Sequence, residues 1–153
     1  MIGRDDGVPG QITHHLFRKN IITELNGYDE SLKFNEDFEL ILRIAKKWKF
    51  LGINKIGFIQ HIRKDSWSNS NPYTAYNGVE KFLKTALNRK LLPLNEIDQR
   101  SKENRLSLVK NLLLQRNRWN EVSPFIDEAF DIMKPQNYKE FILFIMNKIL
   151  KSF

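Results

Sequence analysis

The clearest amphipathic pattern in the chain begins just after Asn35. From Phe38 onward the apolar positions are 38, 41, 42, 45 and 48, and polar side chains lie between them. This spacing of three and four residues predicts a helix over residues 36–48. Asn35 is a favourable N-cap residue, so the helix is expected to carry two acids, Glu36 and Asp37, in its first turn.

The segments on either side of this helix predict a turn and short strands. Residues 19–25 predict a short helix that stops at Asn26-Gly27, because both of these residues tolerate a positive φ. Residues 14–18 predict a strand before it, and two further candidate strands follow at 50–53 and 56–63. The first seventy residues are therefore expected to mix helices with a few short strands.

Beyond residue 70 the pattern is helical. Asn71-Pro72 predicts a cap followed by proline at the first helical position, and Ser123-Pro124 predicts a second start of the same kind. The four helices predicted here cover residues 73–92, 96–118, 125–133 and 138–150. They are expected to pair as two helical hairpins with Phe141, Phe144 and Ile145 in the core.

These elements predict an α+β fold in which the strands are confined to the first part of the chain. Residues 1–70 form an α/β segment with a few short strands, and residues 71–153 form a mostly α-helical C-terminal region. The chain has 153 residues, 41% hydrophobic and 28% charged, which is enough for a folded domain with a core and does not indicate disorder.

Composition excludes several classes of site and segment. With no cysteine the chain has no disulfide framework, thiolate metal site or cysteine nucleophile. No stretch approaches the roughly 18 apolar residues of a membrane span, and the first residues lack the apolar core of a signal peptide. These features are compatible with the cytoplasm, and the predicted location is cytoplasmic, with the inner face of the membrane as an alternative.

The net charge of +7 suggests anionic partners. Nucleic acid is not expected, because no recognised binding motif accompanies the charge. A nucleotide sugar, peripheral contact with an anionic membrane, or ordinary solvated faces each fit a basic balance that is spread along the helices.

Two hypotheses explain the acids at the start of the helix over 36–48. In the first, Glu36 and Asp37 only stabilise the positive end of the helix dipole, and Glu39 supports the helix by pairing with Arg43 four residues later. In the second, Asp37 is a general base that removes a proton from a hydroxyl during group transfer. The spacing alone does not choose between them.

The wider pattern resembles the acceptor-side half of the family 2 glycosyltransferases, which have the GT-A fold. The resembling segments are Leu-Phe-Arg-Lys at 16–19, Asn-Gly-Tyr-Asp-Glu at 26–30, and Glu-Asp-x-x-Leu-x-x-Arg at 36–43. The family has Gly-Gly-Phe/Tyr-Asp-Glu at the second segment, so Asn26 replaces its first glycine. The resemblance covers about residues 8 to 70, under half of the chain, and implies that Asp37 is the catalytic base and that Glu36 positions the acceptor or the base.

A second segment extends the resemblance. Family members often end the catalytic core with Tyr-Arg-x-His and a Ser-x-Ser loop, and Ser66-Trp67-Ser68 matches the loop. On this alignment Arg63 stands where the family has histidine, and its guanidinium suits phosphate oxygens. The resemblance therefore implies that Arg63, Ser66 and Ser68 contact the diphosphate, while His61 is a weak candidate for a metal ligand.

Two aromatic side chains complete the candidate site. Trp67 is either a hydrophobic lid or a platform on which a sugar stacks, and His15 could contact substrate from the end of the strand at 14–18. His14 and His15 are a poor pair of metal ligands, because neighbouring side chains on a strand point to opposite faces.

The implied function is transfer of a sugar from a nucleotide-sugar donor to a hydroxyl acceptor. In the family, the nucleotide-binding half with its Asp-x-Asp metal motif lies upstream of this region, and the parent enzyme uses Mg or Mn. The chain is therefore expected to be a C-terminal fragment, without tightly bound cofactor and inactive in isolation. The alternative is a non-catalytic helix-rich binding module that docks a protein partner or an anionic surface.

Overall fold

The computed structural model describes residues 15–53, 71–115 and 119–151. Within these ranges it contains six helices and no strand. The helices are α1 (Lys19–Glu24), α2 (Glu36–Ala45), α3 (Pro72–Asn88), α4 (Leu94–Leu114), α5 (Trp119–Ile132) and α6 (Tyr138–Leu150).

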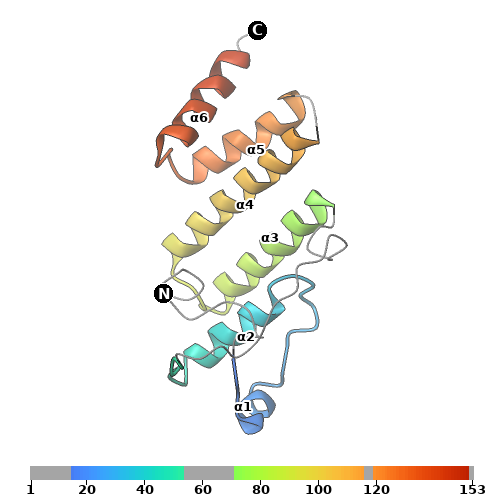
Figure 1. Ribbon diagram of the computed structural model, residues 1–153, viewed down its shortest axis with the longest axis vertical. Coiled ribbons are helices and arrows are strands. Elements are labelled where there is room, and N and C mark those ends of the chain that lie inside the picture. The colour runs from blue at the N-terminus through green and yellow to red at the C-terminus, as the bar shows by residue number, and fades with distance from the viewer. Residues whose placement is uncertain (1–14, 54–70, 116–118, 152–153) are drawn as a thin grey trace.

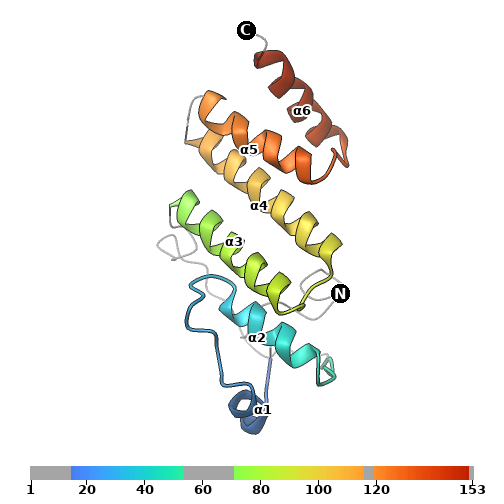
Figure 2. The ribbon, with the colours of Figure 1, turned by 180° about the vertical axis from the view of Figure 1, so that it is seen from behind.

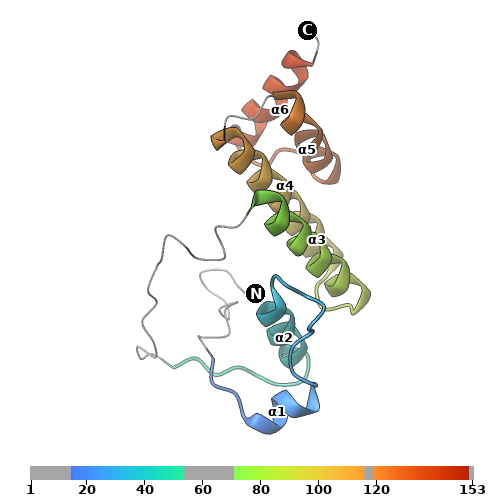
Figure 3. The ribbon, with the colours of Figure 1, turned by 90° about the vertical axis from the view of Figure 1, so that its right-hand side faces the viewer.

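The helices are stacked in the order in which they occur in the chain. Figure 1 shows α3, α4, α5 and α6 side by side, with successive helices running in alternating directions, and α2 beside α3. The same order is seen from behind in Figure 2. In Figure 3, α1 and the extended residues around it lie beyond α2, at the opposite end of the stack from α6.

The prediction of an α+β fold is wrong, because the part of the chain that the structure describes is all-helical. Residues 15–18 and 50–53 are irregular rather than strands, and the candidate strand at 56–63 lies outside the described residues. Ring contacts join the two segments without a strand ladder. His15 stacks on Phe17 at 5.4 Å between ring centroids, and Phe50 meets both rings edge-on. The aliphatic residues of the two runs are exposed, since Leu16, Leu51 and Ile53 are 98%, 89% and 71% exposed, so apolar content did not indicate a buried strand here.

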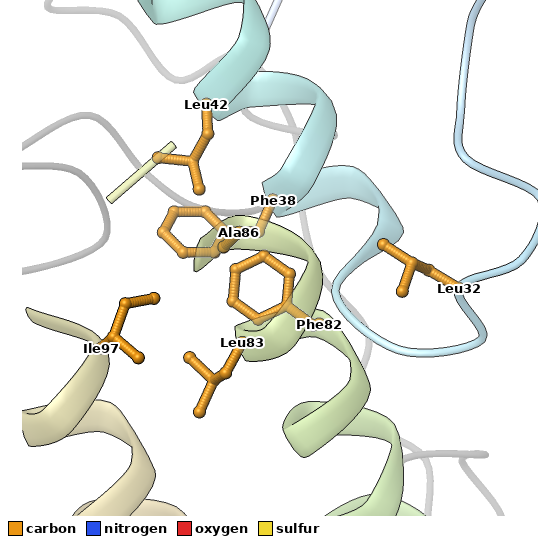
Figure 4. Close-up of a cluster of buried hydrophobic side chains, with 7 residues drawn as sticks. All are labelled: Leu32, Phe38, Leu42, Phe82, Leu83, Ala86 and Ile97. Atoms are coloured by element: carbon orange, nitrogen blue, oxygen red, sulfur yellow. The ribbon is translucent and has the colours of Figure 1, made fainter. Parts of the chain in front are cut away.

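One hydrophobic cluster joins α2 to α3 and to the start of α4. Figure 4 shows Phe38 and Leu42 of α2 facing Phe82 of α3, with Ile97 of α4 on the far side. The rings of Phe38 and Phe82 are 5.5 Å apart between centroids. The cluster contains residues from both sides of position 70, where the division between two parts was predicted. That division remains a prediction, since the residues around it lie outside the described ranges.

A second cluster lies between the C-terminal half of α4 and α5. Its buried members are Leu108, Val109, Leu112, Val122, Ile126 and Phe130. Phe144 of α6 packs against it and meets the ring of Phe130 edge-on at 5.4 Å. The two clusters therefore attach α2 to one side of the helix stack and α6 to the other.

Of the two helix starts predicted from a cap residue followed by proline, one is confirmed and one is wrong. Asn71 caps α3 as expected, because its side chain accepts a hydrogen bond from the backbone N–H of Tyr73 at 2.9 Å. The predicted start at Ser123-Pro124 is wrong, since α5 already begins at Trp119 and contains Pro124. Val122 explains the earlier start: its side chain is fully buried in the second cluster, which favours helix on the N-terminal side of the proline.

The prediction that the apolar residues of α6 are core holds for only part of the helix. Phe144 packs on the second cluster, whereas Phe141 and Ile145 are 56% and 39% exposed. One face of α6 packs on α5, so the apolar residues on its other side stay exposed. Among the described residues, no helix combines the length and apolar character needed to cross a membrane.

Candidate functional site

The candidate site is built around the first turn of α2. Glu36 and Asp37 occupy this turn and are each partly buried. Asn35 stands at the N-cap position with φ of 58°, but its side chain makes no capping hydrogen bond. Asp37 Oδ1 instead accepts a hydrogen bond from the N–H of Phe38 at 2.7 Å, so this carboxylate serves one of the amide donors at the helix start.

The turn before α2 has the backbone conformation that its sequence predicts. Asn26 and Gly27 have φ of 58° and 65°, which confirms the expected left-handed stop after α1. Asp29 then organises the following residues, because its Oδ1 accepts a hydrogen bond from the N–H of Ser31 at 3.0 Å. This is the local side-chain turn that aspartate commonly forms.

Arg43 holds this turn against α2. Its Nε lies 2.9 Å from both carboxylate oxygens of Glu39, which confirms the predicted pair. Its two terminal nitrogens reach across to the turn and donate to the carbonyl oxygens of Leu25 and Gly27, each at 2.6 Å. One guanidinium therefore joins the end of α1, the turn and the middle of α2.

A second arginine, which the sequence did not suggest, completes the network. Arg89, just after α3, donates to Glu39 Oε1 at 2.6 Å and to Asp29 Oδ2 at 2.7 Å. The carboxylate of Glu39 is completely buried between Arg43 and Arg89. Breaking an ion pair of Glu39 is therefore expected to cost much more stability than breaking an exposed pair within one helix.

Charge and hydrogen bonding shift the pKa values of two members of this network. The hydrogen bonds from Ser31, followed by the charge of Arg89, hold the pKa of Asp29 below its usual value against a smaller opposing effect of burial. The hydrogen bond to Glu39 raises the pKa of Arg89, and the charges of Glu39 and Asp29 add to it. Both shifts favour the ionised forms that the ion pairs require.

Tyr28 connects the turn to the candidate base. Burial is the largest cause of the raised pKa of Tyr28, and the negative charges of Asp37 and Glu36 raise it further. Tyr28 is still 45% exposed. It therefore lies within electrostatic reach of the two carboxylates at the start of α2, and all three residues are accessible in part to solvent.

Of the other predicted site residues, His15 alone lies within the ranges that the structure describes. His15 contacts the rings of Phe17 and Phe50. The remaining predicted residues lie outside the described ranges, and these are His61, Arg63, Ser66, Trp67 and Ser68. Their suggested contacts with the diphosphate, a sugar or a metal stay predictions.

Metal binding is not supported by the residues that the structure describes. Among them, no group of three or more His, Asp or Glu side chains is placed to hold a metal ion. This finding does not bear on Mg or Mn in a parent enzyme, because the resemblance assigns that metal to an upstream half.

Comparison with known proteins adds no relative. No protein-family model, curated protein or solved structure matches this chain.

Proposed function

We propose that this chain is the acceptor-side portion of a family 2 glycosyltransferase and that Asp37 is the catalytic base. The observation that carries the proposal is how the resembling segments meet. Arg43, the last residue of the third segment, binds the carbonyl of Gly27 in the second. Tyr28 of that second segment then lies close enough to Glu36 and Asp37 for their charges to raise its pKa.

The four acids of this region have two different surroundings, and this difference supports the assignment. Asp29 and Glu39 are bound by arginines and hold the turn on α2. Glu36 and Asp37 lie partly exposed at the first turn, where the helix dipole favours negative charge. A carboxylate in such a position can accept a proton from an approaching hydroxyl.

In the proposed reaction, Asp37 takes the proton from the acceptor hydroxyl as its oxygen attacks the anomeric carbon of the donor. The bond between that carbon and the diphosphate breaks, and the nucleotide diphosphate leaves with the bonding electrons. Glu36 orients the acceptor or Asp37. The donor is held by a nucleotide-binding half that the resemblance places upstream, so residues 1–153 alone carry the acceptor side of the reaction.

The decisive experiment uses an enzyme in which a nucleotide-binding half precedes this portion. Asp37→Asn is expected to lower kcat by about 10²–10⁴-fold, the usual contribution of a general base. Glu121→Gln is the matched control, because Glu121 is also an acid in the first turn of a helix, α5, but lies outside the resembling segments. Equal activity of Asp37→Asn and wild type, with unchanged circular dichroism, would remove Asp37 as the base.

The 153-residue chain gives a second test. Isothermal titration with UDP and Mn is expected to show no binding, because the donor site belongs to the other half. Micromolar affinity would contradict the proposed division of the site.

A second candidate function is a helix-rich binding module without chemistry. The all-helical character of the described residues and the structural use of Asp29 and Glu39 favour it. The native gene distinguishes the two, because an in-frame Asp-x-Asp half before Met1 supports the transferase and an unrelated upstream segment supports the module.

A further inference from the structure

The side of α6 that faces away from α5 carries a row of large apolar side chains. Leu143, Phe144 and Asn147 face the second cluster and α5. The opposite side is called the outer face of α6, and its residues are between 39% and 70% exposed. They are Tyr138, Phe141, Ile142, Ile145, Met146 and Ile149.

The outer face is continuous along the whole helix. Tyr138, Ile142, Ile145 and Ile149 are spaced by four, three and four residues, so they form one stripe along α6. Figure 1 and Figure 3 show α6 at the end of the helix stack, with α5 on its inner side. Single exposed apolar residues are ordinary, but a stripe that runs the length of a helix marks an interaction surface.

Lysines border this stripe on both sides. With 3.6 residues per turn, Lys139 lies roughly a quarter turn to one side of the stripe and Lys148 roughly a quarter turn to the other. The ammonium of Lys139 lies 5.8 Å from the centroid of the Tyr138 ring on the outer face, and that of Lys148 lies 5.5 Å from the centroid of the Phe144 ring on the inner side. Both lysines are exposed. The acid of α6, Glu140, is on the inner side, where it pairs with Lys102 at 2.6 Å.

We propose that the outer face of α6 binds an anionic lipid bilayer, with the helix lying in the plane of the surface. The apolar stripe would enter the boundary between headgroups and acyl chains, and the bordering lysines would bind lipid phosphates. The net charge of +7 adds longer-range attraction to such a surface. This inference does not depend on the transfer reaction, because α6 lies outside the resembling segments.

Charge complementarity favours a bilayer over a second copy of the chain. Two α6 helices packed on their outer faces would bring lysine borders together, and the acid of α6 would remain on the inner side, paired with Lys102. Like charges facing each other across an interface oppose association. A bilayer containing anionic lipid supplies negative charge along both borders and apolar volume between them.

Vesicle sedimentation tests the proposal on the 153-residue chain. The chain is expected to sediment with vesicles of phosphatidylcholine mixed with phosphatidylglycerol and to bind vesicles of phosphatidylcholine alone much more weakly. A variant with Ile142→Asp and Ile149→Asp is expected to lose at least about tenfold in affinity, because charge is placed in the apolar boundary. The control is Leu94→Asp, since Leu94 is 63% exposed at the start of α4, away from α6.

A second pair of variants tests the lysine borders. Lys139→Gln with Lys148→Gln is expected to weaken binding to the mixed vesicles by about 25-fold, at about fivefold for each lysine at the surface. The matched control is Lys84→Gln with Lys110→Gln, which removes the same charge from exposed positions on α3 and α4. This control is expected to change binding by less than about threefold, because those charges lie farther from the lipid.

Three results would overturn the proposal. The first is no sedimentation with the mixed vesicles. The second is binding that the Ile142→Asp, Ile149→Asp variant retains in full. The third is a wild-type dimer in analytical ultracentrifugation that this variant converts to monomer without any vesicle binding by the wild type, which would assign the outer face to a second copy.

Discussion

Replacing Arg43 with methionine tests whether the network around Glu39 is the structural centre of the N-terminal part. Methionine keeps the unbranched stem of arginine as far as the position of Nε but removes all its donors. The four hydrogen bonds lost are two to Glu39 at 2.9 Å and one each to the carbonyls of Leu25 and Gly27 at 2.6 Å. The change therefore removes the hydrogen bonds of Arg43 to the turn and one of the two cations that neutralise Glu39, while Arg89 still joins Asp29 to Glu39.

The magnitude follows from burial. Removing one partner of a buried ion pair costs about 3–5 kcal/mol, because the other charge is left without compensation. Glu39 is completely buried, while Arg43 is 17% exposed, and Arg89 remains as a second partner. We therefore expect the lower end of the range, a loss of about 3 kcal/mol in the free energy of unfolding.

Arg89→Met is the matched control, because it removes the other cation from the same carboxylate. The side chain of Arg89 is 44% exposed, so solvent screens both of its ion pairs. We expect a loss of about 1 kcal/mol. Urea titration followed by circular dichroism measures both values. Equal losses for the two variants, or a loss below about 1 kcal/mol for Arg43→Met, would refute the assignment of Arg43 as the main support of Glu39.

Three further changes probe other contacts. Gly78→Ala is expected to destabilise the fold by about 1–3 kcal/mol, because the added Cβ would overlap the ring of Phe34 and lie 2.9 Å from its Cβ. The same change in a Phe34→Ala background is expected to cost clearly less, because only the contact with Cβ remains, and thermal melts compare the pair. Ser123→Ala is expected to lower the free energy of unfolding by about 1–3 kcal/mol, because the Ser123 hydroxyl donates to buried Asn147 at 2.7 Å. A change below about 0.5 kcal/mol in urea titration would contradict this. Burial alone would raise the pKa of Glu140, but the hydrogen bonds it accepts and the charge of its buried lysine partner lower it. The stabilisation that ionised Glu140 contributes is therefore complete above pH 4.5, its ordinary pKa, and is lost as the pH falls through its pKa in the folded protein. The free energies of unfolding of wild type and Glu140→Gln are expected to differ by about 1–3 kcal/mol at neutral pH and to converge in acid. A constant difference across that range would rule out this pKa shift.

The features that sequence predicted well are local ones. The cap at Asn71 and the turn at Asn26-Gly27 depend on the conformational preferences of a few adjacent residues, and both are present. The pairing of Glu39 with Arg43 is also local, because residues four apart meet on one side of a helix.

The features that sequence missed depend on contacts between distant segments. Arg89 is fifty residues from Glu39 in the chain, and no pattern near Arg89 distinguishes it from the other basic residues of the helices. The strands at 14–18 and 50–53 were inferred from apolar content, which cannot show whether a neighbouring strand is present to receive hydrogen bonds. The start of α5 was misplaced because burial of Val122 outweighs the usual meaning of a proline near a helix start.

The order of the helix stack has a consequence for how the molecule opens. From α3 to α6 each helix packs mainly on the helices next to it in the sequence, so separating the outermost one breaks a single interface and leaves the rest assembled. Architectures of this kind lose structure from an end rather than all at once. Among the helices from α3 to α6, amide hydrogen exchange is therefore expected to be fastest in α6 and slowest around Leu108 and Leu112. A bilayer that holds α6 would slow exchange in that helix.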